Sequence, residues 1–406
     1  MRRKRAKGAP RYLVSIGAGI NQIPLIREAK ALGFSVIGVD ANTAAAGMIH
    51  CDLKIQESAE DYDEIYVKLR EFIIDGAIAG VLSKSYGPSI RTACYLAEKF
   101  DITLIPFRRA GDFLDKARMK ETFAEGGITS PAHLTLNDRK KTRGLERFSY
   151  PLIVKPAVGH AKRGVRLIAN EREMKGHLAG WDGVHPVIVE EYVEGDEIIA
   201  AGIVRGGRYH LVDISDKVLS DPPFFVDLAH LSPSRHFGMK DAISATGQRV
   251  ADAFEIRTSP LIMELRVTPA GALHLIEAVP EFGGEFIPDI LIPRRTGYNF
   301  IAETIRAATG MDFSAPSPRA GRKSVVVKYI TGRKGTLLSF TPEKAEAMKG
   351  VAFVRVFKDI GAPIVTPETN HDRVGVVVAE GKTRQDAVDC ADAAIERLNI
   401  RIRPAE

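Results

Sequence analysis

Cysteine is scarce in this sequence of 406 residues. The three cysteines, Cys51, Cys94 and Cys390, are odd in number and far apart, and no two have Cys-x-x-Cys spacing. This pattern excludes a disulfide-rich secreted scaffold and the common cysteine metal sites. It predicts reduced thiols in the core of a cytoplasmic protein.

Long apolar runs are also missing. No stretch approaches the ~18 apolar residues that a membrane-spanning helix requires, so we expect no membrane partner. The apolar residues after the N-terminus, YLVSIGAGI, are typical of a strand and turn rather than of a signal peptide.

The body of the chain has no excess of positive charge. The formal net charge is +6, but residues 1–11 contain six cations and no acid, so the remainder has 51 basic residues against 51 acidic ones. We predict that residues 1–11 form a disordered basic tail. A basic cluster without interleaved aromatic residues gives no support for a nucleic-acid partner.

The length predicts several domains, because single hydrophobic cores rarely exceed ~250–300 residues. Apolar strands alternate with helical patterns over residues 12–110, which predicts an α/β domain with a parallel sheet, including a short strand at ITLIP (102–106). Residues 111–313 combine the helix DKARMKETFAEGG with strand-rich segments. Residues 314–323 are a predicted linker, and residues 324–406 a small α+β subdomain. The fold class is therefore α/β and α+β, multidomain.

A glycine turn follows the first predicted strand, and two interpretations of it stay open. Gly17 and Gly19 lie between a strand and a helix, and the next strand ends at Asp40, as in dinucleotide-binding domains. Gln22 stands where the fingerprint requires a third glycine, which speaks against NAD. An aspartate at a strand end is also a common turn residue.

Two glutamates, Glu264 and Glu277, stand on strands that a Pro- and Gly-containing turn joins into a predicted hairpin. Their spacing lets both carboxylates reach one face at its open end. Mg²⁺ is usually held by one or two carboxylates together with phosphates and water, so this pair is a candidate metal site. Solvated charge around the turn IEAVPEFGGE is the simpler alternative.

Together, the segments DKARMK…GITSP, PLIVKP, AVGHAKRG, VIVEEYVEGDE and the Glu264–Glu277 pair resemble the ATP-grasp superfamily, over residues from about 12 to 400. The resemblance implies a Rossmann-like pre-ATP-grasp domain followed by a two-lobed ATP-grasp fold. Its small lobe would span about 130–195 and its large lobe about 196–313. ATP and Mg²⁺ (or Mn²⁺) would bind between the lobes.

The resemblance also implies roles for individual residues. Glycine-rich loops of this kind present backbone amides to phosphate oxygens, and nearby cations neutralise the transferred charge. The implied nucleotide-binding residues are Lys116, Lys155, Gly159, Gly164, Glu190, Glu191, Tyr192, Val193 and Glu197, with Lys162 and Arg163 as catalytic cations.

The second acidic strand departs from the family pattern. Val279 and Glu281 stand where the family has an Asn metal ligand and often an Arg. Glu281 is then a candidate third metal ligand beside Glu264 and Glu277. Arg266 and Arg373 are candidates for the missing catalytic cation, and both are equally compatible with structural ion pairs.

The implied activity is that of an ADP-forming ligase. It would phosphorylate a small-molecule carboxylate to an acyl phosphate and transfer the acyl group to an amine. Asp227, His230 and Arg294 are candidate substrate residues, and a homodimer is the candidate assembly. A bicarbonate-activating or carbamoyl-phosphate-type enzyme and a catalytically silent nucleotide-binding module are the alternatives.

Overall fold

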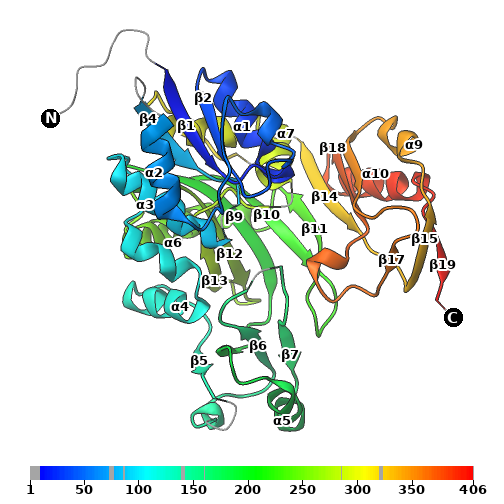
Figure 1. The fold of residues 1–406 in the computed structure, drawn as a ribbon. Coiled ribbons are helices and arrows are strands. Elements are labelled where there is room, and N and C mark those ends of the chain that lie inside the picture. Colours follow the sequence, from blue (N-terminus) through cyan, green and yellow to red (C-terminus); the bar gives the residue numbers. More distant parts are fainter. Residues whose placement is uncertain are drawn as a thin grey trace.

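The computed structural model describes residues 10–72, 77–85, 87–138, 142–159, 161–284, 286–319 and 323–405. The predicted disordered tail therefore falls mostly outside the described residues, although Arg11 is already the first residue of β1. Four sheets organise the chain (Figure 1).

The N-terminal domain contains the predicted parallel sheet, in the order β3-β2-β1-β4. Its strands are buried apolar runs, as parallel sheets covered by helices require. The elements are β1 (Arg11–Ile16), α1 (Ile23–Ala31), β2 (Ser35–Val39), β3 (Leu53–Ile55), α2 (Tyr62–Phe72), β4 (Ala77–Leu82) and α3 (Ile90–Lys99).

The expected strand at residues 102–106 is wrong. Leu104 and Ile105 are buried, which explains the apolar run. The Leu104 carbonyl accepts hydrogen bonds from the amides of Arg257 (2.9 Å) and Thr258 (3.1 Å), but no ladder continues on either side. Burial without repeated pairing therefore produces an extended connector, not a strand.

Two side chains of the N-terminal domain form hydrogen bonds at the glycine turn after β1. The Ala18 amide donates to the Asp40 carboxylate (2.9 Å). Gln22 crosses to the end of β4, where its Oε1 accepts from the Lys84 amide (2.7 Å) and its Nε2 donates to Ser83 (3.1 Å). Asp40 and Gln22 thus act as turn-forming residues here.

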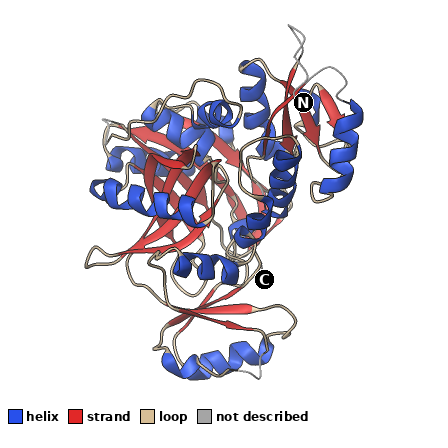
Figure 2. Ribbon diagram, turned by 90° about the vertical axis from the view of Figure 1, so that its left-hand side faces the viewer, coloured by secondary structure: helices blue, strands red, loops and turns tan. Residues whose placement is uncertain are grey.

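The small lobe lies at the bottom of Figure 1, away from the other sheets, and Figure 2 shows its helix beneath its strands. Its antiparallel sheet has the order β5-β8-β6-β7. The helix α4 (Lys116–Glu125) leads into it, and the lobe itself contains β5 (His133–Leu136), β6 (Leu152–Pro156), β7 (Arg166–Ile168), α5 (Glu171–Gly180) and β8 (Val187–Glu191).

The large lobe is built on an eight-stranded sheet with the order β13-β12-β9-β10-β11-β14-β18-β16. The strands and helices from the large-lobe part of the chain are β9 (Asp196–Arg205), β10 (Arg208–Leu219), β11 (Asp227–Ser232), α6 (Lys240–Ala253), β12 (Thr258–Val267), β13 (Leu273–Val279), α7 (Ile292–Thr296) and α8 (Phe300–Ala308). One buried apolar cluster includes Val14 and Ile37 of the N-terminal domain and Ile198 and Met263 of this sheet. The two sheets therefore share a core.

The C-terminal segment extends the same large sheet. β14 (Ser324–Ile330) pairs with β11, and β18 (Gly375–Gly381) and β16 (Val351–Val356) follow. The rest of this segment forms a three-stranded sheet and two helices: β15 (Gly335–Ser339), α9 (Pro342–Glu346), β17 (Pro363–Ile364), α10 (Arg384–Arg397) and β19 (Arg401–Pro404). Residues 324–406 contain both strands and helices, as an α+β segment requires. Because β14 pairs with β11, however, the large sheet continues past the predicted linker at 314–323. Within the described part of the chain, no helix is both long and apolar enough to span a bilayer.

Candidate functional site

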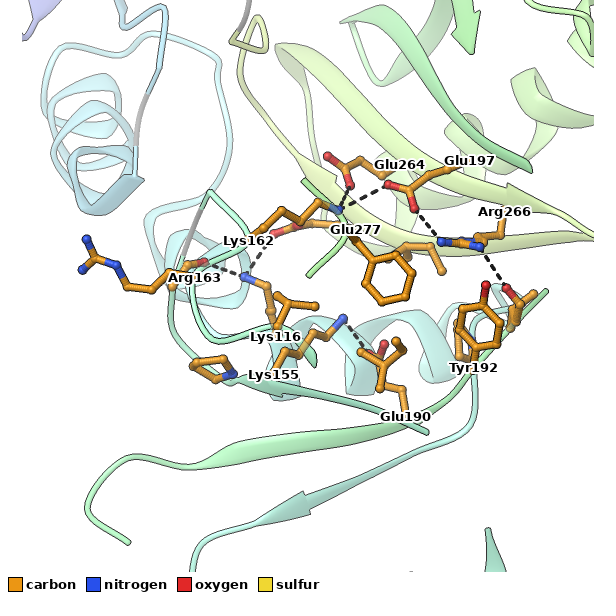
Figure 3. A pocket seen from close by; sticks show the side chains of 18 of the residues that line it. Lys116, Lys155, Lys162, Arg163, Glu190, Tyr192, Glu197, Glu264, Arg266 and Glu277 are labelled. Atoms are coloured by element: carbon orange, nitrogen blue, oxygen red, sulfur yellow. Dashed lines mark hydrogen bonds and ion pairs between the residues drawn. The ribbon is translucent and has the colours of Figure 1, made fainter. Parts of the chain in front are cut away.

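A cavity of about 150 Å³ lies between the small lobe and the large sheet (Figure 3). Small-lobe residues such as Ile153 and Lys155 line one side of it, and Glu264, Arg266 and Glu277 line the opposite side. The structure thus brings together segments that are more than 100 residues apart.

Most of the sequence-predicted site residues line this cavity. They are Lys116, Lys155, Gly159, Lys162, Arg163, Glu190, Glu191, Tyr192, Val193, Glu197, Asp227, Glu264, Arg266 and Glu277. Gly164, His230, Glu281, Arg294 and Arg373 are not among the lining residues. Phe225 and Asn370 line it without having been expected.

A buried ion-pair cluster marks the small-lobe end. Glu190 of β8 pairs with Lys155 of β6 (2.8 Å) and with Lys120 of α4 (3.1 Å). Burial alone would raise the pKa of Glu190, but the two lysines outweigh it and lower this pKa to about 2. Burial lowers the pKa of Lys120 to about 8, against the opposing effect of Glu190. The cluster therefore has more positive than negative charge and leaves Lys155 as a cation at the cavity wall.

Lys120 was not among the residues predicted from the sequence, although a signal was present. It follows Lys116 by four residues in a helix that Asp115 caps through its hydrogen bond to the Ala117 amide (2.8 Å). Residues four apart lie on the same helix face, so the DKARMK motif places Lys116 at the cavity wall and Lys120 beside it, buried against Glu190.

The link between β8 and β9 is fixed by Arg266. Its guanidinium donates to the carbonyls of Val193 (3.3 Å) and Gly195 (3.1 Å), and it pairs with Glu197 (3.1 Å). It also lies over the Tyr192 ring at 5.3 Å. Arg266 is therefore engaged at this link (residues 192–195), which we call the hinge. From the sequence, Arg266 was a candidate for the missing catalytic cation.

The hinge also depends on a glycine. Gly195 has a φ of +142°, and a Cβ there would lie 2.1 Å from the Val267 carbonyl oxygen of β12. The hinge backbone can approach the large sheet this closely only without a side chain. Beside it, the Tyr192 and Phe225 rings stack with centroids 6.2 Å apart, which gives this end of the cavity an aromatic wall.

The two predicted metal ligands face each other on the hairpin of β12 and β13. Glu264 and Glu277 are directly opposite in the strand register. Lys116 pairs with Glu277 (3.3 Å) and donates to the Gly159 carbonyl (2.7 Å). Burial would raise the pKa of Glu277, but Lys116 and other nearby lysines lower it, so the carboxylate is ionised.

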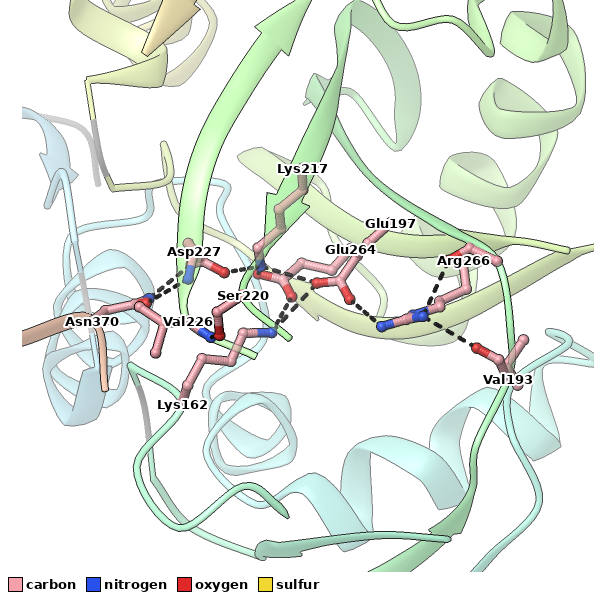
Figure 4. A network of polar contacts seen from close by, with 11 residues as sticks. Lys162, Val193, Glu197, Lys217, Ser220, Val226, Asp227, Glu264, Arg266 and Asn370 are labelled. Atoms are coloured by element: carbon pink, nitrogen blue, oxygen red, sulfur yellow. Dashed lines mark hydrogen bonds and ion pairs between the residues drawn. The ribbon is translucent and has the colours of Figure 1, made fainter. Parts of the chain in front are cut away.

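A buried lysine on β10 completes the large-lobe end (Figure 4). Lys217 pairs with Glu264 (2.9 Å), Glu197 (3.1 Å) and Asp227 (3.4 Å). Burial would lower its pKa, but the three carboxylates raise it well above the ordinary value. Lys217 was not predicted from the sequence, because only the paired strands place its side chain among these acids.

The glycine loop after β6 supplies a further cation. Lys162 pairs with Glu197 (3.3 Å) and Glu264 (3.7 Å), and its pKa is raised because these carboxylates outweigh burial. Ala161 and Lys162 have left-handed φ values of 57° and 62°, and Gly164 has 73°. The loop thus bends in a conformation that non-glycine residues rarely adopt. His160 lies outside the described residues.

The structure does not group Glu281 with Glu264 and Glu277. Among the described residues, no three His, Cys, Asp or Glu side chains are placed to hold a metal ion together. Val279 packs against the apolar cluster that contains Phe282 and Phe300. A metal role of Glu281 stays a prediction.

The candidate substrate residues are held by protein partners. Asp227 accepts a hydrogen bond from Asn370 (2.7 Å). His230 is buried opposite Lys217 in the strand register. Arg294 is exposed and pairs with Glu380 (3.4 Å), and the neighbouring Arg295 pairs with buried Asp213 (3.3 Å).

Arg373, the other candidate cation for an acyl phosphate, is also used within the protein. Its Nε donates to the Asn370 carbonyl (2.7 Å), and its guanidinium lies 3.8 Å from the centre of the Tyr329 ring. The Arg373 side chain thus braces the turn next to the cavity.

The two lobes, the glycine loop and the facing glutamates define a fold of the ATP-grasp class. Residues 148–289 match the ATP-grasp domain family, and residues 328–403 match L-amino acid ligase C-terminal domain 2. Residues 148–289 are therefore an ATP-grasp domain.

Solved structures share this fold. The L-amino acid ligase from Bacillus licheniformis matches with a TM-score of 0.82 and 18% identity, over 100% of each chain. Phosphoribosylglycinamide synthetase from Anaerococcus prevotii matches with a TM-score of 0.75 and 18% identity, over 97% of this chain and 100% of that one.

Curated relatives match over part of their length. The uncharacterized protein y4rH of Sinorhizobium fredii is 29% identical, over 71% of this chain and 61% of that protein. D-alanine–D-alanine ligase A of Bacillus cereus is 30% identical, over 25% of this chain and 34% of that protein. The matches thus span less than two thirds of either relative.

Proposed function

We propose that the protein is an ATP-dependent carboxylate–amine ligase that forms ADP. The observation that carries this proposal is the arrangement of charges at the cavity: Lys116, Lys155 and Lys162 line it together with Glu264 and Glu277, and buried Lys217 pairs with Glu264. Lysines bind phosphate oxygens, and paired carboxylates suit Mg²⁺, so this set fits a magnesium-bound triphosphate.

Each end of the cavity has a separate task in this proposal. Tyr192, Val193 and Phe225 hold the adenine ring against the aromatic wall, with Glu191 at the cavity rim, and Glu197 accepts from the ribose hydroxyl groups. Lys116 and Lys155 hold phosphate oxygens, while Gly159 and Gly164 allow the loop backbone to approach them. Glu190 keeps Lys120 and Lys155 charged and in position.

The proposed reaction has two steps. The substrate carboxylate attacks the γ-phosphorus of ATP, which gives an acyl phosphate and ADP. The amine then attacks the acyl carbon, phosphate leaves, and the amine loses a proton. Lys162 and Arg163 neutralise charge on the transferred phosphoryl group, and Lys217 holds Glu264 from within the sheet, since positioning and electrostatics dominate such transfers. Bound Mg²⁺ on Glu264 and Glu277 would supply additional charge neutralisation and polarise phosphate oxygens.

The C-terminal match favours an amino acid among the substrates, because residues 328–403 match a domain of L-amino acid ligases. Asp227, His230 and Arg294 stay the candidate substrate residues, and a homodimer the candidate assembly. ATP consumption favours a cytoplasmic location. A bicarbonate-activating enzyme shares the fold but would not require an amino acid.

The test is phosphate release from ATP with pooled amino acids and small carboxylic acids, with and without Mg²⁺. We expect release that depends on an added acid and on Mg²⁺, and a coupled product detected by mass spectrometry. Stimulation by bicarbonate alone would favour the bicarbonate-activating alternative. ATP binding without release under any condition would overturn the ligase proposal and favour a silent nucleotide-binding module.

A further inference from the structure

One side chain from the C-terminal segment reaches into the cavity (Figure 4). Asn370 lines it, more than 140 residues after Asp227, with which it forms two hydrogen bonds. Its Nδ2 donates to the Asp227 carboxylate (2.7 Å), and its Oδ1 accepts from the Asp227 amide (3.0 Å). Asn370 therefore joins the C-terminal segment to β11.

The turn that presents Asn370 is firmly built. The amide and hydroxyl of Thr369 both donate to the Asp372 carboxylate, at 2.7 and 2.9 Å. Arg373 donates to the Asn370 carbonyl (2.7 Å) from its place over the Tyr329 ring. The position of Asn370 is thus set by several contacts that do not involve the cavity.

The same turn contacts the glycine loop. The backbone amide of Asn370 donates a hydrogen bond to the Ala161 carbonyl (3.3 Å). Ala161 and Lys162 have left-handed backbone conformations, which cost free energy in non-glycine residues and persist only when the surroundings impose them. The hydrogen bond from Asn370 thus holds Ala161, the residue directly before Lys162. Lys162 is the lysine that pairs with Glu197 and Glu264.

We propose that Asn370 is a positioning residue for the glycine loop. Its side chain fixes the 369–373 turn to Asp227, and its backbone amide then holds Ala161 so that Lys162 faces the carboxylates. The inference rests on the proposed nucleotide site, because it assigns the loop to ATP phosphates. It makes the C-terminal segment part of the machinery that binds ATP.

Limited proteolysis of the full chain tests the contact with the loop directly. Trypsin cleaves after lysine and arginine, so Lys162 and Arg163 report how firmly the loop is held. We expect Asn370→Ala to increase cleavage at these two bonds about tenfold, since a hydrogen bond to a charged group contributes on that order. Glu368→Ala, a neighbouring change at an exposed position, is the matched control and should leave cleavage unchanged.

An exchange of the two side chains separates positioning from general stability. Asp227→Asn combined with Asn370→Asp keeps one carboxylate and one amide at this contact, so we expect loop protection to return to within about threefold of the original. Cleavage spread over the whole chain in Asn370→Ala, or selective cleavage that the exchange fails to reduce, would overturn the inference.

Kinetics and nucleotide binding distinguish this inference from the proposed function. In an active preparation, Asn370→Ala should raise the KM for ATP about tenfold while kcat changes less than about threefold. If the unsubstituted protein shows no ATP binding by calorimetry, the proposed function fails. If it binds ATP and Asn370→Ala has the same KM and the same loop cleavage, the positioning role fails alone.

Discussion

The two ends of the cavity hold their charges differently. At the small-lobe end, the side chains of Glu190, Lys120 and Lys155 are 3%, 1% and 7% exposed. At the large-lobe end, Lys217 and Glu197 are also deeply buried (1% and 5% exposed), but the hairpin carboxylates Glu264 and Glu277 retain exposures of 24% and 28%. A deeply buried charge is costly without its partner, whereas a partly exposed carboxylate can exchange an ammonium group for another cation. The small-lobe cluster is therefore a fixed support, whereas Glu264 and Glu277 make the other end exchangeable, because they can bind a ligand cation in place of a lysine.

The largest effect on activity is expected at the exchangeable end. Glu277→Gln should reduce acid-dependent phosphate release on the order of a thousandfold, because a group that stabilises charge in the transition state is lost. Thermal unfolding should change little, since Lys116 keeps its hydrogen bond to the Gly159 carbonyl. Turnover that persists in a folded variant would show that the metal assignment is wrong.

At the fixed end, substitution of Glu190 should mainly change the free energy of unfolding. Glu190→Gln leaves Lys120 and Lys155 buried without a carboxylate, and we expect it to lower the free energy of unfolding by about 3–5 kcal/mol. Glu191→Gln, at the exposed neighbouring position of β8, is the matched control and should stay within about 0.5 kcal/mol. Urea unfolding measures both. Equal stabilities for the two variants would contradict the comparison.

Acid should weaken the same cluster. The Glu190 pKa is about 2 in the folded protein, against an ordinary value of 4.5, so the unfolded state binds a proton first as the pH falls. The stabilisation is present above pH 4.5 and is lost as the pH falls toward 2, by about 3 kcal/mol in total. Glu190→Gln should remove this part of the pH dependence in urea unfolding. An unchanged pH dependence would exclude Glu190 as its source.

The smallest effect is expected at Glu281. It does not line the cavity, so Glu281→Gln should change kcat and the apparent affinity for Mg²⁺ less than about threefold. Titration of Mn²⁺ with the nucleotide present, followed by electron paramagnetic resonance, gives a second measurement. If Glu281→Gln reduced activity as much as Glu277→Gln, Glu281 would be a metal ligand. The exchangeable end would then include a residue outside the β12–β13 hairpin.

Local patterns predicted much of the fold and part of the site. The hairpin spacing placed Glu264 opposite Glu277, because a turn between adjacent strands fixes their register. The alternation of apolar strands and helices identified the N-terminal parallel sheet. Residues 102–106 failed as a strand because burial of Leu104 gives the same apolar pattern without a pairing ladder.

The rest of the site depends on contacts between distant segments. Asn370 has no local signal in the sequence, since its role comes from Asp227 and Ala161. Arg266 was expected near a phosphate because it lies two residues after Glu264. The packing of the hinge against β12 instead directs it to the carbonyls of Val193 and Gly195.

By itself, the sequence determined the order of the elements, the lysine and glutamate motifs and their resemblance to one superfamily, because periodicity and short spacing are local properties. Only the tertiary structure decided which carboxylate each lysine meets and that the large sheet continues into the C-terminal segment. Ion pairs and strand pairing form between residues far apart in the chain, and their strength depends on burial. The fixed support at Glu190 and the link from Asn370 to the glycine loop follow from that arrangement.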